Sequence, residues 1–330
     1  MEYLSVPPFS EKLSRIALGT WVMGGSLWGG ADDKDSENTI SAALDKGINV
    51  IDTAPAYGTG RSESIVGNVL KKTKKREKVF ISTKCGLEFK PDGSAFRNLT
   101  REFILKDFEN SLKRLQTDYI DIYYLHWPDP LVPIEKTAEV LAEIHKQGKI
   151  KAIGLSNHTP EQIKSFRKIA PCHFCQPPYN LFEREIEKDL LPFCKENKIA
   201  LMTYSALCRG LLSGKMDRHR PFKDDDLRKG MDPKFQDPAF GEYVEASKKL
   251  DELAQKKYQR NVIALAIRWI LDQGVAIAIW GARRPDQLSP VDEAMGWQID
   301  ENTKKEIDTI LKQTVVHPQS NAFMGPPTRK

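Results

Sequence analysis

Apolar runs of strand length alternate with segments of helical periodicity along most of this chain. Three of the runs lead directly into a polar side chain that can do chemistry, namely Asp52, Lys84 and His126. A segment of helical character follows each of them. The pattern therefore predicts successive parallel strands that carry these side chains at their carboxyl ends, the face on which barrel enzymes build their active sites.

The alternation gives eight predicted strands, each followed by a helix, which is the count of an α/β fold of the (β/α)8 TIM barrel type. The strands are predicted at 15–18, 49–52, 79–84, 120–126, 152–155, 172–175, 200–203 and 276–279. The helices are predicted at 36–46, 62–72, 101–115, 135–147, 187–196, 240–257, 262–272 and 301–313, with another opening at Thr159-Pro160. No linker composition divides the chain, so residues 1–330 are expected to form a single domain.

Three features are added to the bare barrel. Residues 3–8 are expected to pair with 13–16 as an N-terminal hairpin that caps the bottom of the barrel. The polar loop 210–238 follows the seventh strand and is long enough to indicate a functional lid. Extra helices follow that loop, and the tail 317–330 has three prolines and no periodicity. The tail leaves two alternatives, which are disorder and folding over the active face.

Charge and composition exclude several classes of partner. The formal charge is only +5, and the densest basic run, 71–78, has no aromatic residue to stack on bases, so no nucleic-acid partner is expected. No run approaches the eighteen or so apolar residues of a membrane helix, and the first residues lack the basic start of a signal peptide. We therefore expect no membrane association, and the sequence leaves any partner proteins unknown.

The five cysteines indicate a reducing compartment. Their number is odd, and Cys172 and Cys175, which form a CxxC pattern, lack a second pair at metal-site spacing. We therefore expect no metal site. Because unpaired thiols suit the cytoplasm, the sequence predicts a soluble cytoplasmic protein.

Asp52, Tyr57, Lys84 and His126 form a candidate proton-transfer site. A phenol with a pKa of about 10 is a poor proton donor or acceptor at neutral pH, and a nearby ammonium lowers that pKa. Asp52 can supply the counter-charge of Lys84, and His126 can polarise a carbonyl. Each residue alone also has an ordinary structural role, as a cap, a rim ion pair or core packing. Their coincidence favours carbonyl reduction, with hydride arriving on carbon and a proton on oxygen.

Several motifs resemble the aldo-keto reductase family over almost the whole chain, from about residue 14 to residue 297. They are Gly19-Thr20-Trp21, the segment 52–58, Ser82-Thr83-Lys84, His126-Trp127, Gly154-Leu155-Ser156-Asn157 and Tyr204-Ser205-Ala206-Leu207. Within the family the chain most resembles the bacterial NADPH-dependent reductases of the general stress protein 69 type. That likeness rests on the segments 28–30, 111–121, 176–185 and 280–283.

The resemblance implies that Tyr57 is the proton donor and that Asp52, Lys84 and His126 are its catalytic partners. It also implies an NADP(H) site, with the nicotinamide carboxamide held by Ser156, Asn157 and Gln176 and the ring stacked on Tyr204. The other residues expected to line the cofactor site are Thr20, Trp21, Asp52, Ser205, Ala206, Leu207, Cys208, Arg209, Gly210, Lys215, Arg228, Gly281, Ala282, Arg283 and Gln287.

The phosphates of such a cofactor would be bound without the GxGxxG fingerprint, which this chain lacks and whose absence argues against a Rossmann dehydrogenase. Arg209, Lys215 and the backbone amides of a glycine-containing loop can neutralise the pyrophosphate. Other reductases place a basic residue at the 2′-phosphate where this chain has Gly281. Arg283 is therefore expected to take that role.

Three tryptophans, Trp21, Trp28 and Trp127, follow strand ends on the active face. We expect them to wall an aromatic substrate pocket, with packing at the barrel rim as the alternative.

The sequence therefore predicts an NADPH-dependent oxidoreductase that reduces small-molecule aldehydes or ketones, including reactive carbonyls formed under stress, to alcohols. The alternative is a regulatory protein in which bound nicotinamide senses redox state and residual reductase activity is slow. A metal-dependent barrel hydrolase would need more His, Asp or Glu at strand ends than Asp52 and His126 provide.

Overall fold

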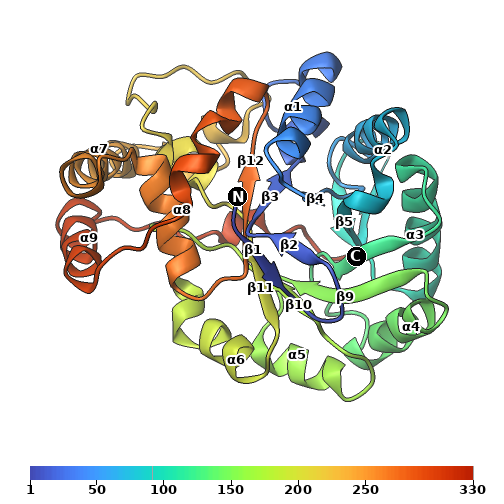
Figure 1. Cartoon of the computed structure of the whole chain (residues 1–330). Coiled ribbons are helices and arrows are strands. Elements are labelled where there is room, and N and C mark those ends of the chain that lie inside the picture. The colour runs from blue at the N-terminus through green and yellow to red at the C-terminus, as the bar shows by residue number, and fades with distance from the viewer. Residues whose placement is uncertain (91, 330) are drawn as a thin grey trace.

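The computed structural model describes residues 1–90 and 92–329 and shows a closed barrel of parallel strands surrounded by helices (Figure 1). Within these residues eight strands close the barrel, and the last of them pairs back onto the first. In barrel order they are β3 (Ile16–Gly19), β4 (Val50–Asp52), β5 (Phe80–Cys85), β8 (Ile120–Leu125), β9 (Ile150–Ser156), β10 (Phe174–Gln176), β11 (Ala200–Thr203) and β12 (Ile277–Gly281). The predicted (β/α)8 architecture is confirmed.

Helices form the outer layer of the barrel, with α7 and α9 lying outside α8 (Figure 1). The α-helices are α1 (Asp33–Asp45), α2 (Arg61–Thr73), α3 (Arg101–Leu115), α4 (Ile134–Lys146), α5 (Pro160–Arg167), α6 (Leu190–Glu196), α7 (Ala239–Tyr258), α8 (Val262–Asp272) and α9 (Glu301–Thr314). Short 3-10 helices occupy the loops: η1 (Trp21–Gly24), η2 (Arg76–Lys78), η3 (Glu185–Lys188), η4 (Cys208–Ser213), η5 (Leu227–Lys229), η6 (Pro233–Phe235), η7 (Pro285–Ala294) and η8 (Ala322–Met324).

Capping side chains fix where several helices begin. Thr100, Asn261 and Asp300 each accept a hydrogen bond from the backbone N–H three residues further on. The capping box predicted before α5 is confirmed, because the Thr159 hydroxyl accepts from the Gln162 N–H and the Gln162 carboxamide oxygen accepts from the Thr159 N–H.

One local prediction was wrong, and one element was missed. The helix predicted at 187–196 is broken at Asp189, whose backbone is not helical and whose carboxylate accepts from the Leu190 N–H to start α6. An antiparallel hairpin of β6 (Leu87–Phe89) and β7 (Ala95–Arg97) was also missed. Its signal was the Asp92-Gly93 pair between the two strands, since that dipeptide favours a hairpin turn.

The N-terminal hairpin closes the bottom of the barrel, as predicted. β1 (Tyr3–Ser5) pairs with β2 (Lys12–Ser14), a slightly earlier register than expected. In the loop between these two strands, the ring of Phe9 lies edge-on to Phe80 of β5, with 4.9 Å between ring centroids.

Side chains inside the barrel alternate along each strand, as the strand period of two requires. The lower layer is apolar and includes Ala17, Val50, Phe80, Ile122, Phe174, Met202 and Ile277. At the carboxyl ends, two to four residues further along the same strands, the inward positions become polar, with Asp52, Ser82, Lys84 and Gln176 all buried. The two-residue alternation that places apolar side chains in the core therefore also directs these polar side chains into one site.

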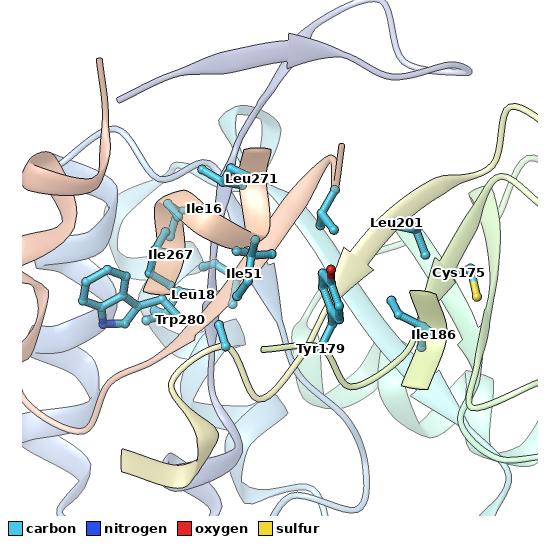
Figure 2. Packing of buried hydrophobic residues seen from close by; sticks show 14 of the residues in the cluster. Ile16, Leu18, Ile51, Cys175, Tyr179, Ile186, Leu201, Ile267, Leu271 and Trp280 are labelled. Atoms are coloured by element: carbon cyan, nitrogen blue, oxygen red, sulfur yellow. The ribbon is translucent and has the colours of Figure 1, made fainter. Parts of the chain in front are cut away.

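The outward-facing side chains of the strands pack against the surrounding helices. Figure 2 shows Ile16, Leu18 and Trp280 of the barrel beside Ile267 and Leu271 of α8. Fully burying an aliphatic side chain contributes about 1.5–3 kcal/mol. This packing holds the helical layer in place.

The long loop after β11 crosses to the loop after β3. Lys223 donates to the backbone carbonyl of Gly29 at 2.8 Å, and the N–H of Leu227 donates to the carbonyl of Leu27 at 3.0 Å. The predicted lid is therefore attached to a second loop of the active face.

The C-terminal tail lies against α7 and the active-face loops. The N–H of Gln319 donates to the Tyr243 hydroxyl at 2.9 Å. Further on, the N–H of Arg97 in β7 donates to the carbonyl of Pro327, also at 2.9 Å.

No helix in the described residues is both long and apolar enough to cross a membrane. Within the same residues, no three His, Cys, Asp or Glu side chains lie together in a way that could hold a metal ion. Cys172 and Cys175 are free, buried thiols.

Candidate active site

The structure brings Asp52, Tyr57, Lys84 and His126 together at the carboxyl ends of β4, β5 and β8. The ammonium of Lys84 donates to Asp52 Oδ2 at 2.8 Å, to the carbonyl of Thr53 at 2.9 Å and to Tyr57 Oη at 3.1 Å. An ammonium has three N–H donors, so these three hydrogen bonds use all of them. Lys84 is buried, with only 1% of the residue exposed. Because the ammonium donates to the phenol oxygen, the proton of Tyr57 points away from Lys84.

Two further donors hold Asp52. Ser82, which pairs with Asp52 in the β4–β5 register, donates its hydroxyl to Oδ1 at 2.8 Å. Gln176 Nε2 donates to the same oxygen at 2.8 Å. Sequence reasoning gave Ser82 no role in the site. The signal was its spacing, because a residue two before Lys84 on one strand shares its inward face.

Close backbone approach positions Tyr57. The segment after β4 lies directly on η1, where a Cβ on Gly24 would be 2.5 Å from the carbonyl carbon of Tyr57. Gly58 has a φ of +66°, and a Cβ there would be 2.2 Å from the carbonyl oxygen of Gly24. Only glycine suits these two positions, so they fix the loop that carries the phenol.

Burial dominates the titration of this site. It raises the pKa of the Tyr57 phenol well above its usual value, and the charge of Asp52 raises it further. Burial also lowers the pKa of Lys84, while Asp52 opposes that change. The expectation that Lys84 lowers the pKa of Tyr57 below its usual value was wrong, because desolvation of the phenolate is the larger effect. Tyr57 therefore keeps its proton at neutral pH, which is the state of a proton donor.

His126 faces Tyr57 with its ring nearly perpendicular, at 80° and 6.2 Å between ring centroids. Burial, and then the charge of Lys84, lower the pKa of His126 well below its usual value. The imidazole is therefore neutral and carries one N–H donor.

Ser156, Asn157, Gln176 and Tyr204 also come together. Asn157 Nδ2 donates to the backbone carbonyl of His126 at 3.0 Å and to Ser156 Oγ at 3.1 Å, and its Oδ1 accepts from the Tyr204 hydroxyl at 2.8 Å. Gln176 Nε2 is bound to Asp52 and Met202, at 2.8 Å and 3.7 Å. The side-chain nitrogens of Asn157 and Gln176 therefore already donate within the protein. What these two side chains can offer a ligand is their carbonyl oxygens, as hydrogen-bond acceptors.

The tryptophans are placed differently from one another. Trp21 lies 6.1 Å from Tyr57 in a stacked arrangement, and Trp28 meets Trp21 edge-on at 5.1 Å. Trp127, beyond His126, lies below the guanidinium of Arg97 at 5.6 Å. Trp21 is therefore the tryptophan nearest the phenol.

Thr20 supports the site from below. Its hydroxyl donates to the backbone carbonyl of Asp52 at 2.9 Å and lies 2.7 Å from the hydroxyl of Ser62. It is completely buried.

The segment after β11 folds into η4 with a left-handed backbone at Ser205, Cys208 and Arg209. The guanidinium of Arg209 is bound to Glu183 at 2.5 Å and to Asp232. Burial alone would raise the pKa of Glu183, but Arg209 and then Lys234 lower it. Arg209 is therefore committed to a buried ion-pair cluster, whereas Lys215 is exposed. Of the others in this segment, Ala206 is buried, and Leu207 and Gly210 are partly exposed.

Arg228, in the loop after β11, and Arg283, after β12, both contact Trp28. Arg228 binds both carboxylate oxygens of Asp226, at 2.8 and 2.6 Å, and lies over the Trp28 ring. Arg283 donates to the Trp28 carbonyl at 2.7 Å. Burial, and then the charge of Arg228, lower the pKa of Arg283.

The turn after β12 surrounds Arg283. Gln287 accepts from the backbone N–H of Arg283 at 2.6 Å, so its side chain carbonyl is used in the turn. Gly281 is exposed, with no atom within 4 Å of a Cβ placed there, and Ala282 is buried.

Comparison with known proteins agrees with this geometry. The family model for the aldo/keto reductase family matches residues 15–312, and the chain belongs to that family. It is 54% identical over 331 aligned residues to aldo-keto reductase YhdN of Bacillus subtilis strain 168, covering 100% of this chain and 99% of that protein.

Two further similarities are to proteins named for an activity. The NADH-specific methylglyoxal reductase of Escherichia coli K12 is 38% identical over 291 residues, covering 84% of this chain and 88% of that protein. The structure of glycerol dehydrogenase AKR11B4 from Gluconobacter oxydans matches with a TM-score of 0.88 and 46% identity, covering 98% of this chain and 99% of that one. The similarity therefore extends to oxidoreductases, but their names do not share one cofactor or one substrate.

Proposed function

We propose that this protein reduces aldehydes or ketones to alcohols with NADPH, and that Tyr57 supplies the proton. The observation that carries the proposal is the phenol of Tyr57, which accepts from Lys84 at 3.1 Å and is kept protonated by burial. A buried phenol whose oxygen faces an ammonium can release a proton and leave a stabilised phenolate.

The residues of the chain then have distinct roles. Tyr57 donates its proton to the substrate oxygen, and the neutral imidazole of His126 donates a hydrogen bond to the same oxygen. Lys84 stabilises the phenolate that remains, while Asp52 holds Lys84 in place at 2.8 Å. The nicotinamide cofactor, when bound, supplies the hydride that reaches the carbonyl carbon.

The acceptor set beside the phenol fits a nicotinamide. Gln176 and Asn157 have committed their amide nitrogens, so the oxygens that remain match the NH2 group of a carboxamide. We assign Ser156 and Tyr204 to the same subsite. The N–H groups of Cys208 and Gly210 already donate within the loop, so the backbone amides of 206, 207 and 209, together with Lys215, would bind the pyrophosphate. Arg209, held by Glu183, anchors the loop.

The choice of NADPH over NADH rests on charge. Arg228, Arg284 and Arg220 all act on Arg283 as like charges, with Asp226 opposing them. Such a cluster favours a dianionic 2′-phosphate, which guanidinium groups bind by charge-assisted hydrogen bonds. The chain's own residues must decide this, because one relative is named as NADH-specific.

The test is a panel of aldehydes and ketones, assayed by oxidation of NADPH and, separately, of NADH. Turnover of several carbonyl compounds with NADPH preferred supports the proposal. Equal use of NADH would contradict the cofactor assignment alone. Tight NADPH binding with no turnover of any carbonyl would contradict the reductase proposal and favour a redox sensor.

A further inference from the structure

A carboxylate lies inside the arginine cluster that we assign to the 2′-phosphate. Asp226, in the loop after β11, is only 6% exposed. Burial alone would raise the pKa of its side chain, but hydrogen bonds from Arg228 hold that pKa below its usual value, so the carboxylate is charged at neutral pH. A buried anion opposes the binding of a dianionic phosphate, and the proposed function gives this anion no role.

Trp28 brings the charged groups together. Arg283 donates to its backbone carbonyl at 2.7 Å, and the guanidinium of Arg228 lies 5.3 Å from the centroid of its ring. Asp226 forms an antiparallel bridge with Trp28. The carboxylate is therefore close to both guanidinium groups, and its charge acts on Arg283 in the opposite sense to that of Arg228.

Asp226 holds Arg228 in the way that a phosphate would. Nε and Nη2 of Arg228 donate to the two carboxylate oxygens at 2.8 and 2.6 Å. A guanidinium binds carboxylates and phosphates through this same pair of parallel hydrogen bonds. The carboxylate of Asp226 therefore takes the edge of Arg228 that could otherwise bind a phosphate.

Arg228 also lies between the two places where the proposed cofactor would carry negative charge. Its Nη1 donates to the backbone carbonyl of Arg209 at 3.3 Å, in the segment assigned to the pyrophosphate. On the other side it shares Trp28 with Arg283, the residue assigned to the 2′-phosphate. A change in the pairing of Arg228 should therefore affect the adenosine end of the cofactor.

We infer that Asp226 is a specificity-determining residue, which limits the preference of this protein for NADPH over NADH. When the cofactor has a 2′-hydroxyl, Asp226 keeps Arg228 paired, so this largely buried cation is not left without a counter-charge. When the cofactor has a 2′-phosphate, the carboxylate competes for Arg228 and repels the phosphate. The inference rests on the NADPH site of the proposed function.

The test is the ratio of the dissociation constants of NADH and NADPH in Asp226→Asn. The substitution removes the charge but keeps the side-chain oxygen that accepts from the Arg228 N–H at 3.0 Å, and asparagine caps a helix as well as aspartate does. We expect the ratio to rise by about tenfold, because a like charge beside the 2′-phosphate is lost. Fluorescence quenching gives both constants. Calorimetry with 2′,5′-ADP and 5′-AMP, which carry only the adenosine end, should show the same change.

Two variants serve as controls. Asp226→Glu keeps the negative charge and should keep a ratio close to that of wild type. Asp224→Asn removes a carboxylate from the same loop, but that side chain is 93% exposed and paired with Lys229, so the ratio should not change.

Each outcome bears on the inference. A ratio that stays the same or falls in Asp226→Asn overturns it, and so does an equal weakening of both cofactors, which would make Asp226 a structural support of the loop. A rise in Asp226→Glu as large as in Asp226→Asn also overturns it, since the charge would not be the cause.

Binding and turnover separate this inference from the proposed function. If wild type binds NADPH but reduces no carbonyl compound, the reductase proposal is overturned and the role of Asp226 is still decided by the ratio. If wild type binds neither cofactor, both proposals are overturned.

Discussion

The ammonium of Lys84 donates to the phenol oxygen of Tyr57 across 3.1 Å, inside a site where both groups are buried. Burial has raised the pKa of Tyr57, and Lys84 is the one cation in direct contact with it among the described residues. Removing that charge should therefore raise the pKa still further.

Lys84→Met tests this relationship through alcohol oxidation, which needs the phenolate as a base. We expect the pH profile of oxidation to move upward by roughly 1–3 units, the usual effect of losing an adjacent opposite charge. Lys46→Met, at an exposed ion pair with Asp292, is the control. An unshifted profile in Lys84→Met would remove Lys84 from this role.

Ser82→Ala tests whether the second oxygen of Asp52 must be held. The buried carboxylate loses a 2.8 Å hydrogen bond. We expect a loss of about 1–3 kcal/mol in the free energy of unfolding, together with a lower kcat at unchanged KM. Thr83→Val is the matched control, because that hydroxyl faces outward and donates to Glu63. A kcat unchanged in Ser82→Ala, or lowered equally in Thr83→Val, would mean that Ser82 is only structural.

Arg283→Ala should weaken NADPH far more than NADH. Loss of charge-assisted bonds to the 2′-phosphate corresponds to about 1.5–3 kcal/mol, or roughly 10–100-fold in the dissociation constant. The constants are measured by fluorescence quenching for both cofactors. Arg101→Ala, whose exposed guanidinium is paired with Glu143 at 2.6 Å and lies outside the arginine cluster, is the comparison and should change little. An equal weakening of both cofactors would show that Arg283 has a structural role.

The buried histidines predict loss of stability in mild acid. The pKa of His158 is lowered by burial to about 4, from an ordinary value of about 6.5, and that of His126 is lowered in the same direction. The unfolded chain therefore binds more protons below pH 6.5, so stability is complete above that pH and falls as pH drops toward 4. Asp107, whose pKa burial raises to about 7, acts in the opposite sense over the same window.

Because Asp107 offsets the histidines over this pH window, the stability profile of the wild type alone does not test the prediction. The test compares the pH dependence of stability in a histidine variant with that of the wild type. Free energies of unfolding are measured by urea titration at pH 7.5 and pH 5. His158→Asn should lose less stability between these two values than wild type, whereas His219→Asn, at an exposed position, should follow wild type. Parallel losses in His158→Asn and wild type would contradict the assignment of a buried neutral imidazole.

The barrel and the residues around Tyr57 could be predicted from local pattern alone. Apolar runs mark strands that are buried on both faces, and the polar residue that ends each run falls on one edge. The same pattern could have found Ser82, because its inward direction follows from the strand period once Lys84 is placed.

Contacts between distant segments could not be read from the pattern. Arg209 looked available for a phosphate, but it is held by Glu183 and Asp232, which lie 26 and 23 residues away. The tail showed no periodicity, and its position depends on partners such as Tyr243. Likewise, the sign of the change at Tyr57 depends on burial, which only the packed barrel determines.

The most direct test of the central claim is the rate of carbonyl reduction by Tyr57→Phe, measured alongside its dissociation constant for NADPH. The substitution keeps the ring beside Trp21 and removes only the hydroxyl. We predict nearly unchanged NADPH binding and a loss of about 10²–10⁴-fold in kcat, the usual contribution of a general acid. A kcat near that of wild type would contradict the account and move the proton donor elsewhere, first to His126.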